Sequence, residues 1–208
     1  LDNNADHLIL IDNKGQVVQE ELLTALLSLI ILKNGEGPVV VPVTSPRVID
    51  DLAQKYQSRV VRTKTALQDF LEKVLDPVNG VNDLSQFFLH FDGLAALVRV
   101  LGHAAHFNVS LSDLVAEIPE FFMSKGEAPV SWEAKGRVIR ELIQDPSASQ
   151  LELLDGVKVF HPNGWTLVLP DPDEPFCRVF SEGSSMEIAE SLTDMYVKKI
   201  YDIAGAAI

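Results

Sequence analysis

The residues best placed for chemistry lie in one short turn near the C-terminus. Residues 169–175 read Leu-Pro-Asp-Pro-Asp-Glu-Pro and hold three carboxylates, those of Asp171, Asp173 and Glu174. The flanking apolar stretches predict a β-hairpin, so we expect the turn to be offered to solvent on a rigid support. No Lys, Arg, Ser or Thr occurs within it. The turn should therefore repel phosphate and could at most attract a cation.

Other reactive side chains give weaker signals. His103 and His106 lie three apart on a predicted helix, but no third metal ligand shares their face, so we favour surface histidines at a helix end. His90 and His161 stand alone, and we interpret each as a satisfied or exposed imidazole. We expect Cys177 to be a buried, inert thiol in a strand. The serines are interpreted as helix caps or loop hydroxyls without a nucleophile elbow, namely Ser45, Ser85, Ser184 and Ser185. We predict no catalytic residue.

Composition narrows the class of protein. The chain has 208 residues, of which 47% are hydrophobic and 23% charged, as in soluble globular proteins of one large or two small domains. Its net charge of −13 disfavours nucleic acid and anionic membrane as partners. One cysteine excludes an internal disulfide and favours the cytoplasm. The longest apolar run, residues 22–32, is too short to span a bilayer. The first residues resemble no targeting signal, and we interpret the sequence as a fragment.

Strands and helices alternate over the first 120 residues. Residues 7–12 and 16–18 predict a hairpin, and residues 20–33 a helix with acids at its start. The valine run 39–43 predicts a buried parallel strand that ends at Pro42, followed by a helix to residue 56 with Ser45 as cap and Pro46 in its first turn. Further on we predict a strand at 59–62, a helix at 66–75, a strand at 86–91, a helix at 93–107 and a Ser110-capped helix at 111–118. This order predicts an α/β three-layer domain.

The last third of the chain follows a different order. Residues 121–130 are either a linker or a crossing strand, and residues 132–144 predict a helix. A loop at 145–150 precedes three predicted strands at 157–160, 165–169 and 176–180, and a helix at 186–204 closes the chain. Helix, antiparallel sheet and returning helix make a small α+β domain, TBP-like in architecture. We therefore divide the chain into residues 1–18, 19–120 and 121–208.

Four motifs stand in a fixed order along this pattern. They are Phe91-Asp-Gly-Leu, Ser131-Trp-Glu-Ala-Lys-Gly-Arg-Val-Ile-Arg, Asp155-Gly-Val-Lys-Val and Gly164-Trp-Thr-Leu-Val-Leu-Pro. Together they resemble the third and fourth domains of the α-D-phosphohexomutases, the family of phosphoglucomutase and phosphomannomutase. On this resemblance, residues 1–18 are a remnant of the strands that follow the family's metal loop. The Trp-x-x-Lys-Gly-x-Val stretch also resembles the mutase-like C-terminal region of some mannose-1-phosphate guanylyltransferases, which carry a nucleotidyltransferase domain upstream.

The resemblance implies a metal loop at the start of the sequence. Members of the family transfer a phosphoryl group between a phosphoserine and a phosphosugar with the help of a divalent metal, and the phosphoserine lies in a first domain that this sequence lacks. The family's Asp-x-Asp-x-Asp-Arg loop corresponds to residues 2–7, where Asp2 and Asp6 remain and Asn4 replaces the middle carboxylate. A weakened Mg²⁺ site at these three residues is one interpretation; solvated loop residues are the interpretation we favour.

The resemblance also implies a sugar loop and a neighbouring basic residue. The family's Glu-x-Ser-Gly-His corresponds by spacing to residues 77–81, of which Asn79 and Gly80 are the remnant. Sugar hydroxyls would lose both a carboxylate and an imidazole. The basic residue of the family's Arg-Thr-Pro-Val-Gly-x-Lys/Arg stretch corresponds to Gln68, although Lys64 could reach the same space.

The phosphate loop is the largest departure from the family. Arg-Pro-Ser-Gly-Thr-Glu-Pro of active members corresponds to the turn described first. Pro170, Glu174 and Pro175 are kept as scaffold, whereas Leu169 replaces the arginine and Pro172 replaces the glycine. Asp171 and Asp173 replace the two hydroxyls. Every group that holds phosphate in the family is thus lost, because proline has no N–H and carboxylates accept rather than donate.

These departures predict a degenerate, non-catalytic phosphohexomutase-like module. We expect it to be a structural or regulatory part of a cytoplasmic sugar-nucleotide pyrophosphorylase, with upstream domains of the same chain as partners and no nucleic acid or membrane. A homo-oligomer is possible. The first alternative is a fragment of an active phosphoglucomutase or phosphomannomutase with a cation-bridged phosphate site. The second makes the acidic turn a docking site for a cation or a basic protein.

Overall fold

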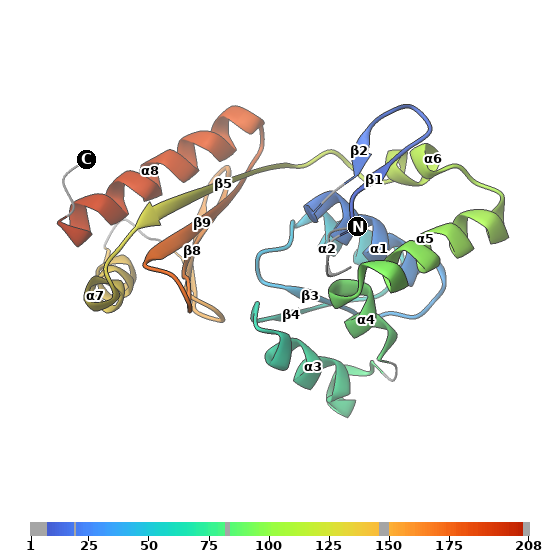
Figure 1. Ribbon diagram of the computed structural model, residues 1–208, viewed down its shortest axis with the longest axis horizontal. Coiled ribbons are helices and arrows are strands. Elements are labelled where there is room, and N and C mark those ends of the chain that lie inside the picture. Colours follow the sequence, from blue (N-terminus) through green and yellow to red (C-terminus); the bar gives the residue numbers. More distant parts are fainter. Residues whose placement is uncertain (1–7, 19, 82–83, 146–149, 206–208) are drawn as a thin grey trace. The chain divides into compact units, whose positions relative to one another are not determined.

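The computed structural model describes residues 8–18, 20–81, 84–145 and 150–205, and these fall into two compact units (Figure 1). The first unit comprises residues 1–120 and the second residues 121–208. The predicted order of an α/β domain followed by a small α+β domain is confirmed. No single helix among the described residues is both long and apolar enough to cross a membrane.

The first unit opens with the predicted hairpin. Strands β1 (Leu10–Ile11) and β2 (Val17–Val18) pair antiparallel. The turn between them is closed by the Asp12 carboxylate, which accepts hydrogen bonds of 2.8 Å from the backbone N–H groups of Lys14 and Gln16. Such local side-chain bonds are typical of aspartate in turns. The strands are shorter than predicted.

A parallel pair of strands forms the centre of this unit. Strand β3 (Val39–Pro42) pairs with β4 (Val60–Thr63) in the register Val40↔Val61. Helices α1 (Glu20–Lys33) and α2 (Val48–Lys55) lie on one face of the pair and α3 (Leu67–Leu75) on the other (Figure 1), while α4 (Ser85–Phe91) lies beside the edge of β3. Valine runs suit such a strand because both of its faces are covered. Helices α5 (Gly93–Phe107) and α6 (Leu111–Ala116) complete the unit.

The predicted strand at residues 86–91 is wrong, because these residues form helix α4. The Gln86 side chain donates to the Pro38 carbonyl over 2.8 Å and accepts from the Val40 N–H over 2.9 Å. It thereby makes the hydrogen bonds that a neighbouring strand would make to β3. Phe87 and Phe91, one helical turn apart, both pack against an apolar cluster made of Val40, Phe70, Val74 and Val81. Their β propensity favours a strand, but their spacing of four suits a helix, and this tertiary packing decides.

The predicted cap of α2 is also wrong. The helix begins at Val48 with Arg47 at the N-cap and no side-chain cap, so Ser45 lies outside it. The Arg62 guanidinium holds this segment by donating to the carbonyls of Ser45 (2.5 Å) and Pro46 (3.2 Å). These bonds satisfy the carbonyls of Ser45 and Pro46, two residues that the prediction placed at the start of the helix.

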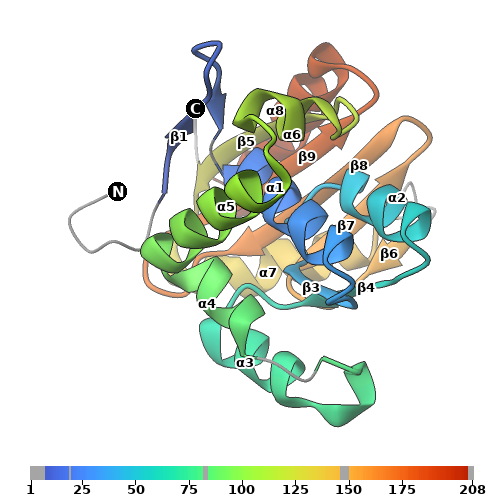
Figure 2. The ribbon, with the colours of Figure 1, turned by 90° about the vertical axis from the view of Figure 1, so that its right-hand side faces the viewer.

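The second unit is a five-stranded antiparallel sheet with the strand order β5-β9-β8-β7-β6. Helices α7 and α8 lie on one of its faces (Figure 2). Of the two alternatives for residues 121–130, a linker or a strand, the structure has the strand. The short strand β6 was not predicted. The elements are β5 (Phe122–Pro129), α7 (Trp132–Ile143), β6 (Leu151–Glu152), β7 (Val157–His161), β8 (Gly164–Pro170), β9 (Phe176–Gly183) and α8 (Met186–Ala204).

The core of this unit lies between the sheet and its two helices. It is built from alternate strand residues such as Val157, Val168 and Val179 and from Val138 and Ile200 on the helices. Their side chains share one face because strand residues alternate and the register pairs Val157 with Val168 and Val168 with Val179. This rigid layer carries the β8–β9 turn.

Candidate functional site

The β8–β9 turn is organised by one of its own carboxylates. Asp171 Oδ1 accepts hydrogen bonds of 2.9 Å from the backbone N–H groups of both Asp173 and Glu174. The Asp171 N–H in turn donates to the Phe176 carbonyl over 3.1 Å, next to the last strand pair, Pro170↔Cys177. The two amides that point into the turn, where an external anion could bind, are therefore already occupied by the protein.

The same carboxylate is paired with a cation from the neighbouring strand. Arg178 Nη2 lies 2.6 Å from Asp171 Oδ2, and the Asp171 side chain is only 4% exposed. The pKa of Asp171 is held below its usual range, first by the Asp173 and Glu174 N–H groups and then by the positive charges of Arg178 and Lys135. The prediction that this turn offers only solvated acid is wrong for Asp171, whereas Asp173 and Glu174 are exposed.

A second cation, the ammonium group of Lys135, is hydrogen-bonded to the backbone of the turn. Lys135 on α7 is 8% exposed, and its Nζ donates to the carbonyls of Asp171 (2.6 Å) and Glu174 (2.5 Å). The ammonium also lies 3.7 Å from the centre of the Trp132 ring, a cation–π contact. Trp132 and Lys135 belong to the Trp-x-x-Lys-Gly motif, whose spacing of three places both side chains on one side of α7.

In this arrangement the two cations stabilise the turn. Lys135 and Arg178 are engaged with the turn itself, and Leu169 pairs with Arg178 across the strands instead of supplying a guanidinium. The nearest thiol, that of Cys177, is buried, and burial raises its pKa to about 11. A thiol in this state is not a nucleophile near neutral pH.

The sugar-loop remnant has a structural role as well. Asn79 Nδ2 donates to the Lys73 carbonyl over 2.8 Å, which satisfies the C-terminal end of α3. The Asn79 carbonyl accepts from Arg59 Nη2 over 2.9 Å, and Gly80 takes the left-handed conformation that ends the short 3₁₀ turn Pro77–Asn79. Lys64, the possible substitute for the lost base, lies 3.1 Å from the Asp69 carboxylate.

The predicted metal ligands Asp2, Asn4 and Asp6 lie outside the described residues. Within residues 8–18, 20–81, 84–145 and 150–205, no three His, Cys, Asp or Glu side chains are grouped so that they could hold a metal. The Mg²⁺ assignment stays a prediction from the resemblance.

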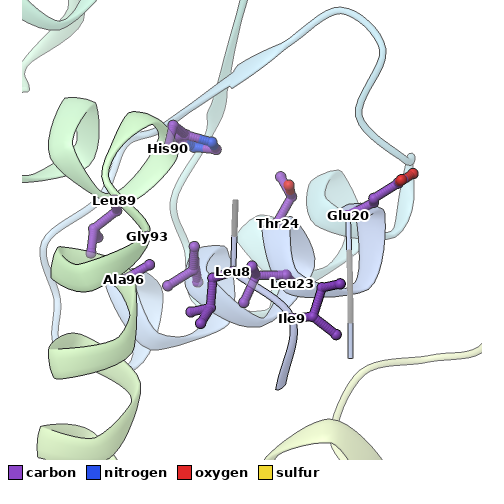
Figure 3. Close-up of a pocket in the computed structure, with 10 residues that line it drawn as sticks. Leu8, Ile9, Glu20, Leu23, Thr24, Leu89, His90, Gly93 and Ala96 are labelled. Atoms are coloured by element: carbon purple, nitrogen blue, oxygen red, sulfur yellow. The ribbon is translucent and has the colours of Figure 1, made fainter. Parts of the chain in front are cut away.

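A cavity of about 240 Å³ lies in the first unit, between the start of the hairpin and helices α1, α4 and α5 (Figure 3). Its polar groups come from Glu20, Thr24 and His90. Its other lining residues are Leu8, Ile9, Leu23, Leu27, Leu89, Gly93 and Ala96. The walls are thus mostly aliphatic, which suits packing or an apolar ligand more than a sugar phosphate.

His90 lines this cavity, and burial lowers its pKa to about 4, whereas its hydrogen bond with the Val40 backbone acts to raise the pKa. The interpretation of His90 as a satisfied imidazole agrees with that bond, although the residue lies on helix α4 and not in the strand predicted at residues 86–91. A neutral imidazole at pH 7 that is bonded to backbone is poorly placed to act as a general base.

Stability of the first unit should fall in acid because of His90. The unfolded chain binds a proton at this imidazole below its ordinary pKa of 6.5, whereas the folded protein does so only near 4. Lowering the pH through this window should remove at most about 3 kcal/mol of unfolding free energy. A His90→Phe variant should lose that part of the pH dependence. Hydrogen exchange of the α4 and β3 amides between pH 7 and pH 4 measures the unfolding free energy at each pH. If this free energy changes equally with pH in both proteins, the pH dependence does not come from His90.

The histidine pair on α5 also departs from its prediction. His106 is exposed, but His103 is 5% exposed and neither of its ring nitrogens has a hydrogen-bond partner among the described residues. Burial and the nearby charges of Lys33 and Arg99 lower the pKa of His103. His103 is therefore a neutral core residue rather than a surface group.

Comparisons with known proteins place this site in context. No protein-family model matches the chain. It is 27% identical over 206 residues to a phosphoglucomutase/phosphomannomutase of Thermococcus kodakarensis, covering 95% of this chain and 45% of that protein. It is 25% identical over 217 residues to a phosphoglucosamine mutase of Methanocaldococcus jannaschii, covering 99% and 48%. The chain spans about half the length of the curated relatives it matches.

Solved structures agree in fold. A phosphoglucomutase/phosphomannomutase family protein from Burkholderia thailandensis superimposes with a TM-score of 0.75 at 18% identity, over 98% of this chain and 45% of that chain. An N-acetylphosphoglucosamine mutase of Aspergillus fumigatus, solved with GlcNAc-6P and magnesium, gives 0.65 at 12% identity, over 98% and 48%. The chain is therefore related to a C-terminal part of the α-D-phosphohexomutase superfamily and has its fold.

Proposed function

We propose that this relative of the phosphohexomutases is a non-catalytic module, a structural or regulatory part of a sugar-nucleotide pyrophosphorylase of the mannose-1-phosphate guanylyltransferase type. The proposal places it in the cytoplasm, beside a nucleotidyltransferase domain of the same parent chain. The observation that carries its non-catalytic part is the position of Asp171. Its carboxylate bonds to the amides of the turn and to Arg178, the donors that a phosphate would need.

The other remnant supports the same proposal. Asn79 caps α3 and is held by Arg59, so its amide is engaged in the fold. In the first unit, α4 supplies Gln86 to the edge of β3 where a further strand could otherwise pair. The polar side chains of Asn79 and Gln86 thus bond to the backbone of their own unit. This is what we expect of a module whose role is structural.

Titration of the chain with inorganic phosphate and with mannose 1-phosphate and glucose 1-phosphate tests the proposal. Calorimetry of the chain should detect no binding, and assay of its parent chain should detect no interconversion of hexose 1- and 6-phosphates. The relatives named as mutases make an active mutase the competing function. Binding of a hexose phosphate with amide shifts at residues 171–174 in NMR spectra would favour that competitor.

Removing the Asp171 carboxylate should give the turn a measurable affinity for phosphate. In an Asp171→Ser variant the N–H groups of Asp173 and Glu174 and the Arg178 guanidinium lose their partner, so the dissociation constant for inorganic phosphate should fall at least about tenfold. Asp173→Ser is the matched control, because it removes the same charge from an exposed position and frees no donor. ³¹P NMR titration compares the two; an equal gain in both variants would mean that charge alone is responsible.

A further inference from the structure

A second cavity of the first unit, of about 330 Å³, lies between the segment that follows α1 and the C-terminal half of α5. Asn34 contributes to one side of it, and α5 contributes Val98, Arg99, Gly102, His103 and Phe107 among others. Its volume is at the lower end of the range for sites that bind small molecules. We call it the α5 cavity.

Two side chains of the α5 cavity carry buried nitrogen atoms without a hydrogen-bond partner. In the part of the chain that the structure describes, six buried side-chain nitrogen or oxygen atoms lack a partner. Three of these six are Nε of Arg99 and the two ring nitrogens of His103, which is 5% exposed and lies one helical turn from Arg99. Buried donors in native proteins nearly always bond to protein, water or a ligand, because an unsatisfied donor is costly.

These groups suit a ligand that accepts hydrogen bonds. Arg99 Nε–H is always a donor, and a neutral imidazole donates from one of its nitrogens. The Glu36 carboxylate is already engaged, because it accepts from Arg99 Nη2 and, over 3.3 Å, from Asn34 Nδ2. An acceptor from outside the described residues would therefore satisfy both donors.

The charges around His103 favour an acceptor that is an anion. After burial, the positive charges of Lys33 and Arg99 have the largest effects on the pKa of His103, and both lower it. Glu117 acts in the opposite direction, and its carboxylate is bonded to Lys33 over 2.5 Å. A site where the two strongest charges are positive attracts a negative group.

The other walls of the α5 cavity are apolar and open. Val98 and Phe107 are 63% and 51% exposed, and the Phe107 ring centre lies 4.6 Å from that of His103. A Cβ added at Gly102 would have no neighbouring atom within 4 Å, so the space beside it is free. These surfaces suit a ligand with an apolar body, which inorganic phosphate and sugar phosphates lack.

We propose that the α5 cavity binds a small organic carboxylate that carries an aromatic or branched aliphatic group. The two carboxylate oxygens accept from Arg99 Nε and from one ring nitrogen of His103, and the apolar group lies against Val98 and Phe107. The proposal does not depend on the absence of catalysis, because the α5 cavity belongs to the first unit and the β8–β9 turn to the second.

Titration of the full 208-residue chain with benzoate tests the proposal. The NMR amide signals of α5 should shift and saturate as benzoate is added. Benzamide has nearly the same shape but no charge, so its dissociation constant should be at least about tenfold higher. Equal affinities for the two probes would overturn the proposal. The absence of a saturable shift in α5 would overturn it too, since the cavity would then hold only water.

His103→Phe keeps an aromatic ring beside Phe107 and removes both unpartnered nitrogens. The dissociation constant for benzoate should rise at least about tenfold, because one charge-assisted hydrogen bond is lost. His161→Phe is the matched control, because His161 lies in the second unit and its Nε2 is also buried without a partner among the described residues. It should bind benzoate as the unaltered chain does. An equal affinity of the two variants would overturn the proposal.

Arg99→Lys provides an independent variant. It keeps a positive charge that can pair with Glu36 and removes the Nε–H. The dissociation constant for benzoate should again rise at least about tenfold. Circular dichroism shows whether each variant is folded. Unchanged affinity in a folded Arg99→Lys chain would overturn the proposal even if His103→Phe failed to fold.

Discussion

Replacing Gly156 with alanine should destabilise the second unit by about 4 kcal/mol. Gly156 has a φ of +67°, and a Cβ there would lie 2.2 Å from the Val168 carbonyl oxygen and 3.1 Å from Leu169 Cα. The left-handed conformation alone costs about 1–2 kcal/mol for alanine. The remainder arises because the obstacle is backbone of the neighbouring strand β8, which cannot rotate away as a side chain can.

Gly205→Ala separates these two contributions. Gly205 has a φ of +70° but nothing within 4 Å of the added Cβ, so its replacement should cost about 1 kcal/mol. Urea unfolding followed by tryptophan fluorescence measures both variants. Both tryptophans of the chain, Trp132 and Trp165, belong to the second unit and therefore report on it alone. Equal losses in the two variants would show that the close approach to β8 has no cost.

Replacing Lys135 with methionine should cost the second unit about 3–5 kcal/mol. The change keeps the aliphatic stem but removes the ammonium that donates to the carbonyls of Asp171 and Glu174 and lies over the Trp132 ring. Hydrogen bonds from a charged donor contribute about 1.5–3 kcal/mol each, and the cation–π contact adds to them. The turn would keep its negative charges and lose a cation that offsets them.

Lys198→Met is the control for this change, since Lys198 is an exposed lysine on α8. It should alter the unfolding free energy by less than about 0.5 kcal/mol. The same fluorescence measurement applies to both. If Lys135→Met unfolds at the urea concentration of Lys198→Met, the two carbonyl bonds contribute nothing net to stability.

Local patterns in the sequence predicted most of the fold. The helices at 20–33, 93–107 and 186–204 have the predicted bounds, because acids or caps such as Asp92 and Ser185 mark their starts and turn residues mark their ends. The prediction for the Phe-rich segment 85–91 failed because its composition suits a strand, whereas its contacts with Val40 and Phe70 decide for a helix. Such contacts are not encoded in a short window of sequence.

The candidate site was less predictable for a related reason. The β8–β9 turn was found by composition, but the state of Asp171 depends on Arg178 across the hairpin and on Lys135, which is 36 residues away in the chain. The composition of the turn alone predicted three exposed carboxylates. The spacing of Trp132 and Lys135 was visible in the sequence, yet nothing in it indicated that the lysine points to the turn. Burial of a charged side chain follows from the fold and not from its neighbours in the chain.

The side chain of Gln86 has one more consequence, for aggregation. Strand β3 is a run of valines, and the open edge of such a strand can pair with another chain and begin an intermolecular sheet. Gln86 occupies the Val40 N–H and the Pro38 carbonyl at that edge. Many proteins protect such an edge with a further strand or with charged residues. In this chain a single buried amide protects these two backbone groups.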